Sequence, residues 1–134
     1  VECPRWAEGQ AASLRCGLAA LRGSERVVVL VGDQPGVTAA AIDRLADAPP
    51  GSRAAYGGRP GHPAVLGREL IAAAQRLEGD RGLRDVAEWR LVECGDVASG
   101  HDVDTPADLA AVREAGAPLR ARQDGPGQSE AGGR

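Results

Sequence analysis

The sequence predicts an α/β fold in which a sheet of buried strands is covered by helices. The run VVVLV at 27–31 is apolar at every position, which is typical of a strand buried on both faces. Segments with helical spacing of apolar residues, such as 68–78, lie between the strand-like segments. Strands and helices that alternate along a chain favour a layered α/β architecture.

The helices are predicted from their apolar spacing and their ends. Apolar residues from Ala11 to Leu21 place a helix over 9–22, and Gly23 closes it. Thr38 is a good N-cap for a helix through Ala46, which the prolines at 49–50 end. A third amphipathic helix covers 68–78, and a shorter one is expected over 83–88.

The strands are predicted over 26–32, 53–57, 64–66 and 90–94, and residues 57–63 are interpreted as a loop because of their composition. Residues 101–116 are interpreted as a strand tip followed by a helix. By length the chain is one domain, expected over 1–116. From Ala117 onward Gly, Pro, Gln, Ser and Arg dominate, so 117–134 is predicted to be a disordered tail.

Composition excludes several classes of function. The net charge is −3 with no basic run, so no nucleic-acid surface is expected. No apolar run is long enough to span a membrane. The three cysteines, Cys3, Cys16 and Cys94, are odd in number and lack C-x-x-C spacing, which favours reduced thiols and a cytoplasmic protein.

Asp33 follows directly after the buried strand, in G-D-Q-P-G. Ligands of α/β sheets bind beyond the carboxyl ends of strands, where this carboxylate is expected. A local explanation is equally compatible with the segment, because Asp in an Asp-x-Pro-Gly turn often bonds backbone N–H groups.

A second acidic cluster lies in HDVDTPADL at 101–109. Thr105, Pro106 and Asp108 suit the start of a helix, but Asp102 and Asp104 are not explained in that way. One Asp at a strand end and another at a strand-to-helix joint suggest a shared Mg²⁺, which prefers one or two carboxylates together with water and phosphate oxygens. Asp33 and Asp104 are therefore candidate metal ligands and catalytic residues.

These segments resemble the MobA/MocA-like nucleotidyltransferases. The matching motifs occur in order: W-x-E-G-x-x-x-S-L at 6–14, G-D-Q-P at 32–35, G-H-P at 61–63, G-D-x-G-x-R at 79–84 and D-V-D-T-P-x-D-L at 102–109. The resemblance implies a three-layer, Rossmann-like nucleotidyltransferase fold. It also implies transfer of a nucleotidyl group, CMP from CTP rather than GMP from GTP, to a phosphorylated acceptor such as molybdopterin, with release of pyrophosphate.

The resemblance implies a role for each matching residue. Asp33 and Asp104 would hold Mg²⁺ against the nucleotide phosphates, and the segment containing Gly9 and Ser13 would face the base and ribose. His62, Pro63, Asp80 and Arg84 would lie on the acceptor side. A molybdoenzyme or its maturation chaperone is the expected partner.

Several candidates also have a local explanation. His62 can be a plain loop residue, and Gly79 and Asp80 can be a helix stop followed by an N-cap. Arg84 can be a solvated charge, and Ser13 can be an exposed helix residue without a function.

The family pattern begins with a strand and a glycine-rich loop of the form L-A-A-G-x-S-x-R-M-G-x-x-K, and neither is present. We therefore expect a longer native enzyme, and we expect this chain alone to bind CTP–Mg²⁺ poorly and to turn over negligibly. Strand 26–32 would lack one hydrogen-bonding neighbour and expose an apolar edge. The alternatives are a catalytically incomplete accessory protein with the same fold, or transfer to another acceptor such as a sugar phosphate or phospholactate.

Overall fold

The computed structural model describes the backbone of residues 1–120 and the side chains of residues 1–115. The chain divides into two compact units, residues 1–101 and the residues from 102 onward. No helix among the described residues is long and apolar enough to cross a membrane.

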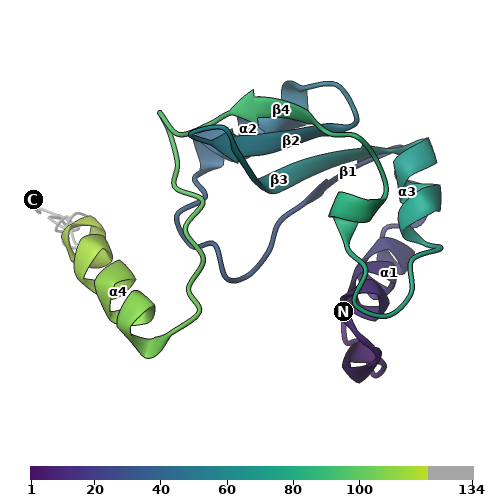
Figure 1. The fold of residues 1–134 in the computed structure, drawn as a ribbon, viewed down its shortest axis with the longest axis horizontal. Helices are drawn as coiled ribbons and strands as arrows, with labels where there is room; N and C mark the ends of the chain where they lie inside the picture. Colours follow the sequence, from purple (N-terminus) through teal and green to yellow (C-terminus); the bar gives the residue numbers. More distant parts are fainter. Residues whose placement is uncertain (121–134) are drawn as a thin grey trace, which may run out of the picture. The chain divides into compact units, whose positions relative to one another are not determined.

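The first unit contains a four-stranded mixed sheet with the strand order β1-β3-β2-β4 (Figure 1). Strand β3 pairs antiparallel with both β1 and β2, whereas β2 and β4 run parallel. The strands are β1 (Arg26–Val29), β2 (Ser52–Tyr56), β3 (Arg59–Gly67) and β4 (Arg90–Glu93). Strand β1 therefore lies at one edge of the sheet, and β3 and β2 form its centre.

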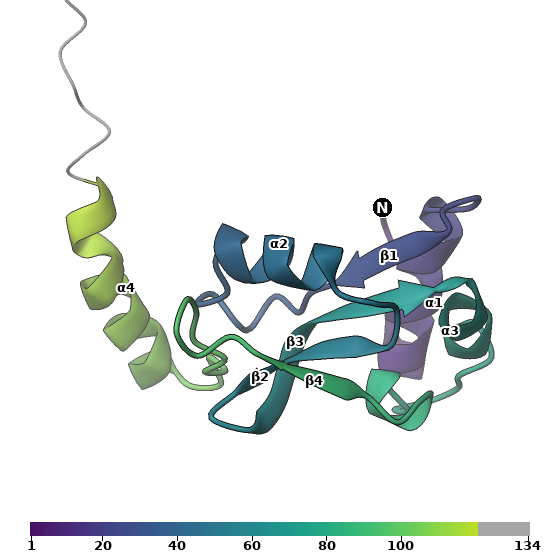
Figure 2. The ribbon, with the colours of Figure 1, turned by 90° about the horizontal axis from the view of Figure 1, so that it is seen from above.

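Helices cover both faces of this sheet, which confirms the predicted α/β architecture. Figure 2 shows α2 on one side of the strands and α1 and α3 on the other. These helices are α1 (Gln10–Ala20), α2 (Ala39–Asp47) and α3 (Arg68–Ala74). Neighbouring residues of β3 point to opposite faces, as the period of a strand requires. Val65 belongs to the apolar cluster under α2, and Leu66 belongs to the one under α1 and α3.

The prediction of a loop over 57–63 is wrong, because β2 and β3 form a hairpin that includes most of it. Gly57 and Gly58 form the turn with φ values of 60° and 76°. Two successive residues with positive φ match the twist of a two-residue hairpin, and glycine adopts that conformation without steric cost. The prolines in 59–63 favour a loop interpretation, because proline lacks the N–H that a strand uses in pairing. In the structure, Pro60 pairs with Ala55 beside a register shift, where an irregular strand tolerates it.

Several predicted elements are shorter than expected. Strand β1 ends at Val29 rather than at 32, and α3 ends at Ala74 rather than at 78. The helix predicted over 83–88 is a single 3-10 turn, Leu83–Asp85. Apolar residues continue at helical spacing beyond the last residue that packs on the sheet. A helix is stabilised mainly by such packing, so it ends before the pattern does.

The second unit contains helix α4 (Pro106–Arg120). Its start has the expected cap: the Thr105 hydroxyl accepts from the Asp108 N–H at 3.2 Å, and the Asp108 carboxylate accepts from the Thr105 N–H at 2.8 Å. The Thr105 hydroxyl also donates to the Asp108 carboxylate at 2.7 Å, and this bond, together with those from the Thr105 and Asp104 N–H groups, holds the pKa of Asp108 below its usual range. The helix includes residues 117–120 of the predicted tail, and residues 121–134 lie outside the described residues.

Candidate functional site

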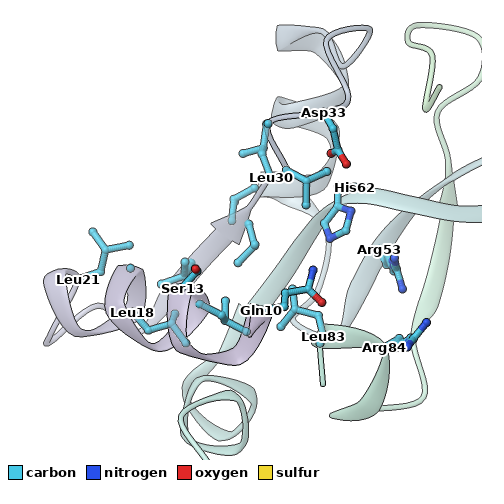
Figure 3. A pocket seen from close by; sticks show the side chains of 18 residues that line it. Gln10, Ser13, Leu18, Leu21, Leu30, Asp33, Arg53, His62, Leu83 and Arg84 are labelled. Atoms are coloured by element: carbon cyan, nitrogen blue, oxygen red, sulfur yellow. The ribbon is translucent and has the colours of Figure 1, made fainter. Parts of the chain in front are cut away.

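A groove of about 740 Å³ runs along strand β1 between that strand and α1. Residues 27–33 form one wall, and Ser13, Leu14 and Leu18 of α1 form another. Arg53, His62 and the segment 82–84 complete the lining. In Figure 3, Leu18 and Leu21 lie at one end of the groove, and His62, Arg53 and Arg84 lie at the other. The groove thus joins an apolar half to a polar half.

Asp33 lies in the turn beyond the end of β1, with its side chain exposed at the groove. The local explanation requires its carboxylate to accept hydrogen bonds from nearby backbone N–H groups. Within residues 1–115, the Asp33 carboxylate takes part in no hydrogen bond or ion pair. The turn therefore does not use the carboxylate, which leaves it available to a ligand.

Hydrogen bonds connect the G-D-Q-P segment to the G-H-P segment. The Gln34 side chain accepts from the His62 backbone N–H at 3.3 Å. The Tyr56 hydroxyl donates to the His62 carbonyl at 2.6 Å, and burial raises the pKa of that hydroxyl. These bonds fix the backbone that carries the His62 ring into the groove, so His62 belongs to the centre of a strand rather than to a loop.

Ser13 and Arg84 also line the groove, as the assigned roles require. Pro63 does not: its side chain is fully buried, which makes it a packing residue. Its peptide bond with His62 is cis. Asp80 and Gly9 lie outside the lining, at the N-terminus of α1.

Gly9 holds the first motif against the G-D-x-G-x-R motif. A Cβ on Gly9 would lie 2.5 Å from the carbonyl carbon and oxygen of Gly79, and 2.8 Å from the Asp80 carboxylate. The Ala11 N–H donates to the Gly79 carbonyl at 3.0 Å. A backbone contact this close admits only glycine at position 9, so Gly9 lets the first motif pack against the G-D-x-G-x-R motif.

Asp104 belongs to the second unit, and Asp33 belongs to the first. The Asp104 backbone N–H donates to the Asp108 carboxylate at 3.2 Å, and its own carboxylate is not part of that cap. The pairing of Asp33 with Asp104 around a metal stays a prediction. Within the described residues, no three His, Cys, Asp or Glu side chains gather into a metal-binding cluster.

An exposed carboxylate without an internal partner fits Mg²⁺ ligation. This ion commonly takes one or two protein carboxylates and completes its octahedron with water and substrate phosphates. Asp33 supplies one such group at the head of the groove. The donor set therefore suits a metal that arrives with a nucleotide rather than one held in a protein cage.

Arg53 is the groove residue that the sequence interpretation missed. It lies in β2, half-buried, among the buried residues Ser52, Ala54 and Ala55. The signal was present in the sequence, because a charged residue inside a short alanine-rich strand needs a reason to be there.

The chain is similar to known proteins in sequence and in fold. Residues 1–94 match the model of the MobA-like NTP transferase domain. The chain is 34% identical over 116 residues to nicotine blue oxidoreductase of Paenarthrobacter nicotinovorans, an alignment covering 75% of this chain and 57% of that protein.

A solved structure resembles the chain as well. It is the crystal structure of a homologue of Mycobacterium tuberculosis rv0371c from Mycobacterium sp. strain JC1, with a TM-score of 0.64 and 28% identity. The likeness covers 80% of this chain and 58% of that one, so the chain spans less than two thirds of both known proteins. The matched model covers most of the chain, which therefore belongs to the MobA-like NTP transferase domain family.

Proposed function

We propose that the chain is part of a Mg²⁺-dependent nucleotidyltransferase that transfers CMP from CTP to a phosphorylated acceptor of the molybdopterin type. A phosphate oxygen of the acceptor attacks the α-phosphorus of the nucleotide, the bond to the bridging oxygen breaks, and pyrophosphate leaves. Family membership supports the reaction class. The choice of CTP over GTP and of molybdopterin rests on the resemblance of G-D-Q-P and G-H-P to cytidylyltransferases.

The observation that carries the proposal is the free carboxylate of Asp33 at the head of the groove. In such a transfer the protein mainly positions two phosphates and balances their charge. Asp33 would hold Mg²⁺, with Asp104 as the second carboxylate. A molybdoenzyme or its chaperone would take the product in the cytoplasm.

Paramagnetic broadening by Mn²⁺ tests this role. With CTP present, Mn²⁺ is expected to broaden the backbone amide signals of residues 32–34 and of Gly36 first, since Pro35 carries no N–H. Asp33→Asn should weaken this effect about tenfold or more, because it removes the charged ligand. Asp43→Asn is the matched control, since Asp43 is an exposed acid of α2 outside the groove. Equal broadening in both variants would contradict the assignment, and GTP in place of CTP tests the base.

An oxidoreductase is the second candidate, because a 34% identical relative carries that name. The specific observation is the apolar half of the groove, where Leu14, Leu18 and Leu21 suit an apolar organic substrate better than a triphosphate. Titration with a reduced nicotinamide dinucleotide distinguishes the candidates. Binding tighter than that of CTP and independent of Mg²⁺ would favour the oxidoreductase.

A further inference from the structure

Arg53 projects from the centre of the sheet towards the groove. Its neighbour Ala54 belongs to the cluster under α2, so the alternation of a strand directs Arg53 to the opposite face, where α1 lies. There it lines the groove together with His62 and Arg84. In Figure 3, His62 lies between Asp33 and Arg53.

The Arg53 guanidinium is oriented by the protein but only partly bonded. Its Nε–H donates to the Gly61 carbonyl at 2.7 Å. A guanidinium has five N–H donors, so the four on the terminal nitrogens remain. Within residues 1–115 those nitrogens make no further hydrogen bond or ion pair. The Nε bond fixes the plane of the group and leaves its terminal fork free to bind.

Within residues 1–115, no acidic side chain pairs with Arg53. Burial lowers the pKa of this guanidinium, and no neighbouring carboxylate offsets that effect. Arg84, on the same side of the groove, has only a contact of 3.9 Å with Asp85 and is 78% exposed. Two arginines around one cavity, one of them half-buried, favour a bound anion, because removing a cation from water without a partner is costly.

We propose that Arg53 is a substrate-binding residue that holds a phosphate monoester of the acceptor in the groove, with Arg84 at its side. This inference rests on the proposed nucleotidyl transfer. A guanidinium fork matches the oxygens of a phosphate in a bidentate arrangement. In Figure 3, His62 lies between Arg53 and Asp33, so Arg53 would hold the attacking phosphate beside the nucleotide–metal complex rather than bind the metal-bound phosphates themselves.

The test follows the Nε–H signal of Arg53 by nitrogen-15 NMR while phenyl phosphate is added. The signal is expected to shift saturably. Arg53→Gln should weaken binding of phenyl phosphate about tenfold or more, and Arg53→Lys should fall between, because it keeps the charge and loses the fork. Arg90→Gln, an exposed change at the start of β4 outside the groove, should bind as the native chain does. A circular dichroism melt confirms that each variant is folded.

Two results would overturn the inference. In the first, phenyl phosphate binds Arg53→Gln as tightly as it binds the native chain. In the second, Arg53→Gln also abolishes the broadening by Mn²⁺ and CTP at residues 32–36, which would assign Arg53 to the nucleotide phosphates. A different result would separate the two proposals. If phenyl phosphate binding depends on Arg53 but Mn²⁺ and CTP broaden no signal near Asp33, the nucleotidyl transfer is refuted and the anion site at Arg53 is retained.

Discussion

The two faces of the sheet differ in how their charged groups are paired. Near α2, the Thr38 hydroxyl donates to the Val97 carbonyl, and Arg44 binds both Asp96 and the Glu93 carbonyl, although the buried Ser52 hydroxyl has no partner within residues 1–115. On the α1 side, the Asp33 carboxylate and the terminal nitrogens of Arg53 have no partner within residues 1–115. Half-buried polar groups are normally satisfied, so the unbonded end of Arg53 marks a place where a ligand can bind.

The apolar packing follows the same division. The cluster under α2 consists of small and medium residues that are fully covered: Ala41, Leu45, Ala54, Val65 and Cys94. Burial raises the pKa of the Cys94 thiol, which makes it a packing group rather than a nucleophile. The cluster under α1 includes Leu18, which also borders the open groove. The face under α2 is therefore closely packed, whereas the face under α1 leaves a groove that a ligand can enter.

The largest expected effect is on the closed face. Leu45 is fully buried, so Leu45→Ala leaves a cavity and should lower the free energy of unfolding by about 2–5 kcal/mol. Leu18→Ala should cost less, near the lower end of that range, because its surroundings open onto the groove and relax more easily. Urea denaturation of both variants measures the difference. A larger loss for Leu18→Ala would contradict the division into closed and open faces.

The next effect concerns how the open face is assembled. Gly9 has φ = 115°, and a Cβ there would meet the Gly79 backbone at 2.5 Å. Gly9→Ala should therefore cost about 1–3 kcal/mol of stability and move the segment 79–84. Gly17→Ala is the control, because nothing lies within 4 Å of its added Cβ, and in a helix interior it should stabilise by about 0.5–1 kcal/mol. Equal melting temperatures would show that the close backbone contact is unimportant.

The sequence predicted the order of the elements well because apolar runs and glycine stops are local signals. Thr38 and Thr105 were identified as caps, and Ala41 N–H does bond the Thr38 hydroxyl at 3.3 Å. The hairpin at Gly57 was missed because strand composition and turn composition overlap there. The position of Arg53 in the groove could not be predicted, because it depends on the order of the strands in the sheet, which brings β2 next to β3. A pairing of Asp33 with Asp104 around a metal would depend on long-range geometry that no local pattern encodes, so it stays a prediction.

A smaller effect is expected at the cap of α2. Thr38→Ala removes the acceptor for Ala41 N–H and the donor to the Val97 carbonyl, and should lower stability by about 1 kcal/mol. Thr38→Ser should recover most of it, because the hydroxyl is kept. Because this helix covers the closed face, phenyl phosphate binding at the groove should stay unchanged in both variants. A parallel loss of binding would mean that the two faces are coupled.

The smallest effect is a pH dependence carried by Glu93 at the end of β4. Its carboxylate accepts from the N–H groups of Gly57, Gly58 and Gly95, which lowers its pKa below the usual 4.5. A depressed pKa means that the folded state favours the ionised form, so this stabilisation is complete above the unfolded pKa. It is lost as the pH falls through the folded value.

Glu93→Gln should therefore flatten the fall in melting temperature between about pH 5 and about pH 3. Glu69→Gln, an exposed change in α3 away from the hairpin turn, is the control. Because the carboxylate holds the hairpin turn, the amide signals of Gly57 and Gly58 should titrate with Glu93 in the native chain and lose this response in the variant. An unchanged acid limb in Glu93→Gln would place the pH dependence elsewhere, with Asp96, whose pKa Arg44 lowers by a hydrogen bond, as the next group to test.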